Sequence, residues 1–226
     1  MEPMKRYAVY YAPPAGEFAA RAAAWLGWDA AAGREVAPPD LGLPAAGITR
    51  DPRKYGFHGT VKPPFRLATG QSADALNQAM AGLCADLPPV SLPGLRLKNL
   101  DGFLALVPQG DPAPLCDLAA GVVRALDPFR APLTEAEVAR RRPERLTVRQ
   151  RQLLDLWGYP YVMEEFRFHL TLTDRLEPEM AAQAETVLSA HFAPVLPAPF
   201  TVDELCLFGE AADGRFHLLH RYTLSG

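Results

Sequence analysis

The chain has 226 residues, enough for one large domain or two small lobes with a buried core. Its 49% hydrophobic and 22% charged residues are typical of a soluble globular protein. The formal net charge of -3 argues against a general nucleic-acid-binding protein, because affinity for the phosphate backbone depends on an excess of lysine and arginine.

The cysteines and the N-terminus indicate a cytoplasmic protein. Cys84, Cys116 and Cys206 are far apart and odd in number, which fits neither a disulfide framework nor a metal-binding spacing. Residues 1–6 lead directly into a strand-like segment, without the apolar core and cleavage motif of an export signal. No apolar run approaches the roughly 20 residues needed to span a bilayer. We expect no cofactor and no metal.

The first half of the chain is predicted to alternate strands and helices. Its strands are rich in aromatic and β-branched residues, and they span residues 5–12, 57–61, 90–100 and 103–107. Asp101-Gly102 predicts a hairpin turn between the last two, and Pro63-Pro64 is expected to end the second. Apolar residues at helical spacing predict helices over 17–28, 72–87 (with Ser72 as its N-cap) and 112–126.

The second half begins with a polar, arginine-rich segment over residues 132–158, which ends in a predicted amphipathic helix that contains Leu153, Leu154 and Trp157. The earlier pattern then returns. A strand is predicted over 166–173, a helix over 178–192, and strands over 200–208 and 215–224.

The order of a strand with His-x-Thr, a helix, a strand, an Asp-Gly turn and a strand therefore occurs twice. This duplication predicts an α+β fold of two pseudo-symmetric lobes, each a mostly antiparallel sheet with outer helices. The lobes are expected to face each other across a central cleft, where a ligand would bind. We expect residues 1–226 to form a single two-lobed domain, with one His-x-Thr strand in each lobe, at 57–61 and 166–173.

The paired motifs suit metal-independent phosphate chemistry. Side chains alternate along a strand, so His58 and Thr60 share one face, as do His169 and Thr171. Histidine titrates near neutral pH, so one ring can serve as a base and the other as an acid. Threonine hydroxyls can donate hydrogen bonds to phosphate oxygens. One His-x-Thr strand is commonly the solvated face of a sheet, but two in equivalent places indicate a catalytic pair.

Nearby cationic and aromatic residues are candidates for binding the substrate. Lys62 is expected on the face of His58, and Arg167 on that of His169, where each could meet a phosphate unless it forms only a surface salt bridge. Tyr11 and Tyr55 could line the cleft or pack in the core.

The arginine-rich segment gives one further candidate for binding. If its helix caps the cleft, Arg149 or Arg145 would bind a second phosphate; otherwise these arginines form a solvated face. The remaining histidines, His191, His217 and His220, have no repeated partner and are interpreted as structural or surface residues.

The two motifs and the repeated order of elements resemble the two-histidine phosphoesterase superfamily, which includes RNA 2′,3′-cyclic phosphodiesterases and bacterial RNA ligase-like proteins. The segments FHGTVKPPF and WGYPYVMEEFRFHLTLT are similar to a bacterial branch encoded with phosphonate-degradation genes. The resemblance implies that His58 and His169 are the acid–base pair, and that Thr60 and Thr171 clamp the phosphate.

The resulting hypothesis is a phosphodiesterase that hydrolyses a small cyclic sugar phosphate, such as 5-phosphoribosyl 1,2-cyclic phosphate. We expect it to bind neither nucleic acid nor a membrane. The nearest alternative is an RNA-end 2′,3′-cyclic phosphodiesterase, against which the negative net charge argues. A non-catalytic nucleotide-binding protein is a further alternative, although binding alone needs no acid–base pair. A zinc hydrolase fits least, because the sequence has no His-Glu-x-x-His and no cysteine pair.

Overall fold

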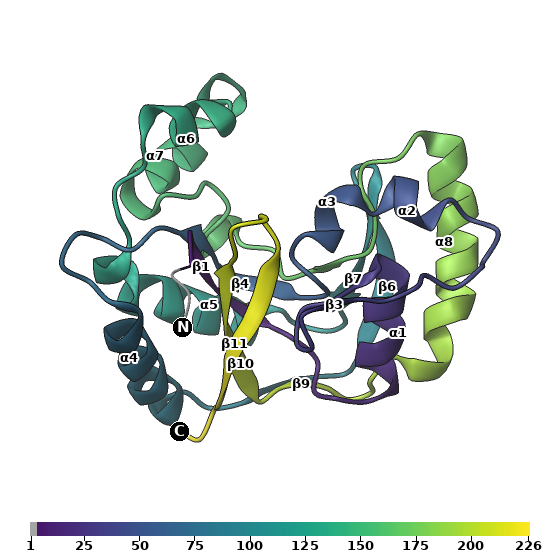
Figure 1. Ribbon diagram of the computed structural model, residues 1–226, viewed down its shortest axis with the longest axis horizontal. Coiled ribbons are helices and arrows are strands. Elements are labelled where there is room, and N and C mark those ends of the chain that lie inside the picture. Colours follow the sequence, from purple (N-terminus) through teal and green to yellow (C-terminus); the bar gives the residue numbers. More distant parts are fainter. Residues whose placement is uncertain (1–3) are drawn as a thin grey trace.

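An antiparallel sheet of seven strands joins the two sides of the molecule in the computed structural model, which describes residues 4–226 (Figure 1). Its strand order is β11-β10-β1-β4-β8-β7-β6. The strands are β1 (Tyr7–Tyr11), β4 (Gly59–Phe65), β6 (Leu95–Leu100), β7 (Phe103–Pro108), β8 (Leu170–Thr171), β10 (Glu204–Glu210) and β11 (Phe216–Thr223). Two short antiparallel pairs lie outside this sheet: β2 (Trp28–Asp29) with β3 (Arg34–Glu35), and β5 (Val90–Leu92) with β9 (Phe200–Val202).

Helices of four to fifteen residues surround the sheet. They are α1 (Glu17–Leu26), α2 (Ala45–Ile48), α3 (Arg50–Arg53), α4 (Ala73–Asp86), α5 (Ala113–Ala125), α6 (Glu135–Arg140), α7 (Val148–Trp157) and α8 (Pro178–Phe192). Among residues 4–226, no helix is both long and apolar enough to cross a membrane. The expectation that the chain lacks an export signal rests partly on Met1–Pro3, which lie outside the described residues.

The sheet divides into two lobes at the junction of β4 and β8, which pair only through Gly59 and Leu170. On one side, β11, β10, β1 and β4 pack against α4 and α5; on the other, β8, β7 and β6 pack against α8 (Figure 1). The buried Trp25 of α1 donates its indole N–H to the Leu172 carbonyl at 2.8 Å, which fixes α1 on the second side. The α+β, two-lobed fold with antiparallel sheets is confirmed.

The two repeats exchange their hairpins. A simple duplication would place each repeat in its own lobe. Instead, the β6–β7 hairpin of the first repeat pairs with β8, the strand of the second motif. The β10–β11 hairpin of the second repeat pairs through β1 with β4, the strand of the first motif. Each lobe therefore contains a motif strand from one half of the chain and a hairpin from the other.

Several predicted strands differ from the structure in extent. The strands predicted over 90–100 and 200–208 each divide in two, into β5 and β6 and into β9 and β10. The prediction that Pro63-Pro64 ends the second strand is wrong, because β4 continues to Phe65 through an irregular register. The strand predicted over 166–173 shortens to Leu170–Thr171. After it, the Thr173 hydroxyl accepts the Leu104 backbone N–H at 2.9 Å, so a side chain replaces the strand carbonyl and the ladder ends.

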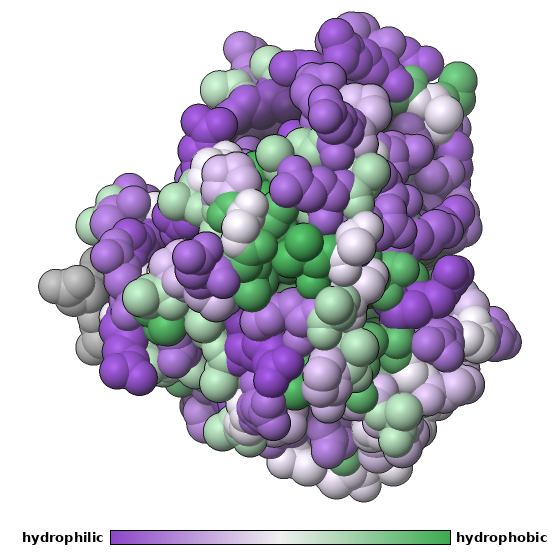
Figure 2. Space-filling view, turned by 90° about the vertical axis from the view of Figure 1, so that its right-hand side faces the viewer, coloured by the Kyte–Doolittle hydropathy of each residue, from purple (hydrophilic) through white to green (hydrophobic). Residues whose placement is uncertain are grey.

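Hydrophilic side chains cover most of the surface in Figure 2, with an apolar area near the middle of that face. Among the described residues, the large hydrophobic side chains that are most exposed belong to Val148, Leu156 and Tyr161. Residues 4–226 form one main buried apolar cluster and two smaller ones.

Candidate active site

The two His-x-Thr motifs lie side by side at the junction of the lobes. Their middle residues, Gly59 and Leu170, are directly paired on antiparallel strands. The flanking residues then face each other crosswise, so each histidine lies opposite the threonine of the other motif. Directly opposed side chains point to the same face with their Cβ atoms about 5 Å apart. The residues brought together on this face are His58, Thr60, His169 and Thr171.

Gly59 allows the close approach on which this junction depends. A Cβ atom at Gly59 would lie 2.4 Å from the Phe168 ring. Phe168 is buried and packs against Tyr11 and Phe200, so it has little room to move away. The glycine between the first histidine and threonine is therefore explained by packing on the face opposite the motif.

Gly59→Ala is expected to lower the free energy of unfolding by about 1–3 kcal/mol, the usual cost of an extra carbon in a packed core. Urea unfolding measures this. The control is Gly82→Ala on α4, where nothing lies within 4 Å of the added carbon and alanine should stabilise the helix by about 0.5–1 kcal/mol. If the two variants were equally stable, Gly59 would not be a packing requirement.

A cavity of about 540 Å³ opens on the motif face. His58, Thr60 and Thr171 line it. His169 is not among the lining residues, but its ring lies 5.7 Å from that of Phe103, which lines the cavity. The volume falls within the range of small-molecule sites. The cavity is therefore large enough to hold a phosphate together with the group that carries it.

Backbone contacts orient both imidazole rings in the same way. Nδ1 of His58 lies 2.9 Å from the Gly56 carbonyl, and Nδ1 of His169 lies 2.7 Å from the Arg167 carbonyl. Since a carbonyl oxygen only accepts, each Nδ1 carries the proton, which leaves Nε2 as the atom available for chemistry. Nε2 of His58 accepts from the Thr60 hydroxyl at 3.2 Å.

Burial makes both histidines easier to deprotonate than in water. Burial, with a smaller contribution from the nearby His169, lowers the pKa of His58 to about 4, although the contact with the Gly56 carbonyl acts in the opposite direction. Burial also lowers the pKa of His169 below its ordinary value. Tyr10 stacks on the His58 ring with centroids 3.9 Å apart and contributes to this burial. In the absence of a bound anion, both rings are neutral at pH 7.

The structure places the two predicted tyrosines differently. Tyr55 lines the cavity, with its ring 5.7 Å from that of His58. Tyr11 does not: it is buried against Phe168 and Phe200. Because side chains alternate along β1, its neighbour Tyr10 faces the cavity instead.

Lys62 does not share the face of His58, so that prediction is wrong. The pairing of β1 with β4 shifts by one residue between Thr60 and Lys62, which reverses the alternation. The lysine is 1% exposed, and its Nζ donates to the Val123 carbonyl at 3.2 Å, with Asp127 at 3.8 Å. Burial lowers its pKa to about 8. Lys62 is a buried, internally paired residue outside the cavity.

Arg167 and Arg149 also lie outside the cavity lining. Arg167 is exposed, as the predicted alternation requires, but its guanidinium folds back to the carbonyls of Glu164 and Phe166, at 3.1 and 2.9 Å. Arg149 lies on α7, half-exposed and paired with Glu164. Arg145 is exposed in the short turn before α7. The arginines that were predicted to bind phosphate therefore do not line the cavity.

Other arginines line the cavity, two of them from the arginine-rich segment, although these were not predicted to bind the substrate. Arg140 and Arg141 come from the end of α6, Arg175 from the segment after β8, and Arg6 from the residue before β1. A sequence motif predicts the helix that carries Arg140 and Arg141. Thr134 and the glutamate three residues later form a capping box, which predicts the helix that carries them.

The remaining groups that bind metals or react as nucleophiles are dispersed. Within residues 4–226, no three His, Cys, Asp or Glu side chains are grouped so that they could hold a metal ion. The cysteines are free, with Cys84 and Cys206 buried and Cys116 partly buried. Burial raises the pKa of the Cys84 and Cys206 thiols to about 11, so neither is poised as a nucleophile.

Curated proteins with the name ribose 1,5-bisphosphate phosphokinase are similar in sequence to most of this chain. Ribose 1,5-bisphosphate phosphokinase PhnN of Janthinobacterium sp. (strain Marseille) is 38% identical over 225 residues, covering 94% of this chain and 49% of that protein. PhnN of Laribacter hongkongensis (strain HLHK9) is 38% identical over 218 residues, covering 92% and 49%. The chain thus spans about half the length of these curated relatives.

Among solved structures, E. coli LigT complexed with 3′-AMP has 19% identity and a TM-score of 0.45 over 100% of both chains. TT0787 of Thermus thermophilus has 16% identity and a TM-score of 0.46 over 98% of both. A family model described as "Protein of unknown function (DUF1045)" matches residues 60–217, which is more than half of the chain. The chain therefore belongs to the DUF1045 family.

Proposed function

We propose that this chain is a metal-independent phosphodiesterase that opens a small cyclic phosphate by acid–base catalysis with His58 and His169. The observation that carries the proposal is the crosswise pairing of the two motifs on one face of β4 and β8, beside a cavity. This arrangement supplies a base, an acid and two hydroxyl donors around one point, as hydrolysis of a phosphodiester requires.

In the proposed reaction, Nε2 of His58 takes a proton from water as the water oxygen attacks phosphorus. The bond from phosphorus to one sugar oxygen breaks, and protonated His169 gives its proton to that leaving oxygen. The hydroxyls of Thr60 and Thr171 donate to the non-bridging oxygens, where negative charge grows. His58 is assigned as the base because its pKa is lowered to about 4, which keeps it neutral across the physiological range.

This assignment predicts a bell-shaped pH profile with an acidic optimum. Activity requires neutral His58 and protonated His169, so kcat/KM should fall below about pH 4 and again above the lowered pKa of His169. The optimum of kcat/KM should therefore lie below pH 6.5. A bound phosphate anion favours the charged imidazole, so the alkaline limb of kcat should lie at higher pH than that of kcat/KM. Initial rates measured between about pH 3.5 and 9 would give the pH profiles of kcat and of kcat/KM. A kcat/KM that rises steadily with pH would contradict the assignment of His58 as the base and His169 as the acid.

The names of the curated relatives suggest the substrate. They are called ribose 1,5-bisphosphate phosphokinases, and this chain matches about half of their length. No Gly-x-x-x-x-Gly-Lys-Ser/Thr sequence, typical of P-loop kinases, occurs in this chain, so we assign the kinase activity to the other half of those proteins. A phosphodiesterase joined to such a kinase would supply its substrate.

The need of such a kinase for ribose 1,5-bisphosphate determines both the proposed substrate and the bond that breaks in it. Hydrolysis of 5-phosphoribosyl 1,2-cyclic phosphate at the bond between phosphorus and O2 leaves ribose 1,5-bisphosphate. Breaking the bond to O1 would instead leave ribose 2,5-bisphosphate. We therefore propose 5-phosphoribosyl 1,2-cyclic phosphate as the substrate, with His169 protonating O2 of the ribose.

An RNA-end 2′,3′-cyclic phosphodiesterase is the second candidate, and one observation favours it. Tyr55, Phe103 and Tyr159 line the cavity, and aromatic rings of this kind can stack on a nucleobase. The net charge of -3 argues against extended contacts with an RNA backbone.

The test is a panel of cyclic phosphates given to the purified protein, with the products identified by phosphorus NMR. The panel contains 5-phosphoribosyl 1,2-cyclic phosphate, ribose 1,2-cyclic phosphate and nucleoside 2′,3′-cyclic phosphates. We expect ring opening of the first to ribose 1,5-bisphosphate, unchanged after exhaustive treatment with EDTA. Loss of activity with EDTA, restored by a divalent ion, would contradict the metal-independent mechanism. Turnover of the nucleoside compounds alone would favour the RNA-end alternative.

A further inference from the structure

Two of the three acidic side chains that line the cavity pair with cations that do not line it. The Glu137 carboxylate pairs with Arg66 at 2.9 Å, and the Asp51 carboxylate pairs with Lys54 at 2.8 Å. Asp174 accepts the backbone N–H groups of the first two residues of α3, at 3.0 and 2.9 Å. Glu137 and Asp51 therefore do not balance the arginines of the cavity, and the single charge of Asp174 is smaller than the combined charge of Arg140, Arg141 and Arg175.

The arginines that line the cavity are mostly unpaired. Arg6 forms an ion pair with Glu210. Within residues 4–226, Arg140, Arg141 and Arg175 form no ion pair. The cavity therefore has an excess of positive charge beyond the motif face.

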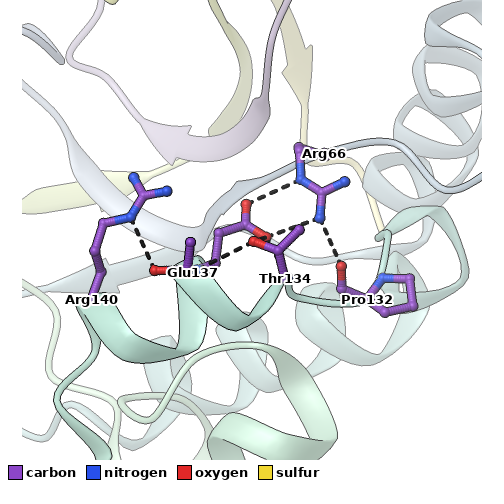
Figure 3. Close-up of polar contacts among 6 residues, drawn as sticks. Arg66, Pro132, Thr134, Glu137 and Arg140 are labelled. Carbon is purple, nitrogen blue, oxygen red and sulfur yellow. Dashed lines mark hydrogen bonds and ion pairs between the residues drawn. The ribbon is translucent and has the colours of Figure 1, made fainter.

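The helix α6 is fixed firmly enough to present two of these arginines. Arg66, just after β4, contacts both carboxylate oxygens of Glu137, at 3.1 and 2.9 Å, and also donates to the Pro132 carbonyl at 2.8 Å (Figure 3). A two-pronged guanidinium–carboxylate contact of this kind is strong and directional. The guanidinium of Arg66, aided by Thr134, lowers the pKa of Glu137 to about 2, so the contact persists throughout the neutral range.

The two arginines at the end of α6 keep hydrogen-bond donors available. Arg140 uses its Nε to donate to the Ala136 carbonyl of its own helix at 3.3 Å, which leaves its terminal nitrogens for a ligand (Figure 3). Arg141 stacks over the Tyr159 ring at 4.7 Å. Stacking uses the face of a guanidinium and leaves the N–H groups at its edge free to bind an anion.

We infer that Arg140 and Arg141 form a second anion subsite, which binds a dianionic phosphate monoester on the same small molecule that carries the cyclic phosphate. The inference rests on the proposed function. A cyclic diester carries one negative charge, which the motif face already addresses, so it leaves Arg140 and Arg141 without a bound anion. A monoester phosphate offers three terminal oxygens to two guanidinium groups.

The experiment compares two substrates that differ only in the distal group: 5-phosphoribosyl 1,2-cyclic phosphate and ribose 1,2-cyclic phosphate. In the wild type, kcat/KM should be at least about tenfold higher for the phosphorylated compound, because one hydrogen-bonded charged contact is worth at least that factor. Arg140→Ala and Arg141→Ala should each reduce kcat/KM for the phosphorylated compound at least about tenfold more than for the other. Arg145→Ala and Arg149→Ala are the matched controls, since they remove the same charge outside the cavity and should change neither value.

The outcomes separate the subsite from the proposed function. If the wild type opens neither compound, the proposed function fails. If the wild type opens both compounds, but Arg140→Ala and Arg141→Ala reduce kcat/KM for the two compounds by equal factors, the proposed function stands and the subsite is overturned. If Arg145→Ala or Arg149→Ala reproduces the selective loss, the effect is a general one of surface charge and the subsite is again overturned.

Discussion

Replacing either His58 or His169 by alanine is expected to lower turnover of a cyclic phosphodiester roughly 10²- to 10⁴-fold. That is the usual contribution of one acid–base group, and each ring offers its Nε2 while its Nδ1 is held by a backbone carbonyl. Steady-state kinetics on the substrate opened by the wild type would measure the loss. The replacement of both histidines should cost little more than that of one, because the two act as a unit.

The control for these variants is His220→Ala. His220 is exposed on β11 and does not line the cavity, so its loss should leave turnover unchanged. Circular dichroism and thermal unfolding should show that the His58 and His169 variants remain folded, since both rings are only partly buried. Near-normal turnover by a folded variant of either residue would eliminate the acid–base mechanism.

Thr60→Val and Thr171→Val are each expected to lower kcat about 10²- to 10³-fold. Valine keeps the shape of threonine but removes the hydroxyl that we propose donates to the non-bridging oxygens. Loss of one such donor lowers kcat by a similar factor in other enzymes. Because charge on these oxygens grows only as the bond breaks, KM should change much less than kcat.

Thr223→Val provides the matched control for the threonines. Thr223 is exposed at the end of β11, and its replacement should alter neither kcat nor KM. If Thr60→Val and Thr171→Val raised KM while kcat stayed constant, the hydroxyls would serve in ground-state binding rather than in stabilising the transition state.

Features that depend on neighbouring residues were predictable from the sequence. The Ser72 hydroxyl caps α4 by accepting from the Ala75 N–H at 3.1 Å, and Asp101-Gly102 forms the turn between β6 and β7. Both signals act over a few residues and need no knowledge of the remaining chain. The two motifs were found for the same reason.

Features that depend on distant contacts were not predictable. The face of Lys62 is set by a register shift against β1, and the length of β8 is set by a contact between Thr173 and Leu104. Alternation along β1 could not distinguish Tyr10 from Tyr11, because both faces of that strand are buried. The exchange of hairpins escaped prediction as well, since either pairing satisfies the same local pattern.

The exchanged hairpins make each half of the chain incomplete without the other. A fragment that ends before α6 would contain β4 and the β6–β7 hairpin, but neither β8 nor the β10–β11 hairpin that those elements pair with. Neither lobe can then close its sheet as an independent folding unit, and folding must await pairings between residues far apart in sequence. The same connectivity means that the two histidines meet only after both halves have assembled, so catalytic competence and completion of the fold become a single event.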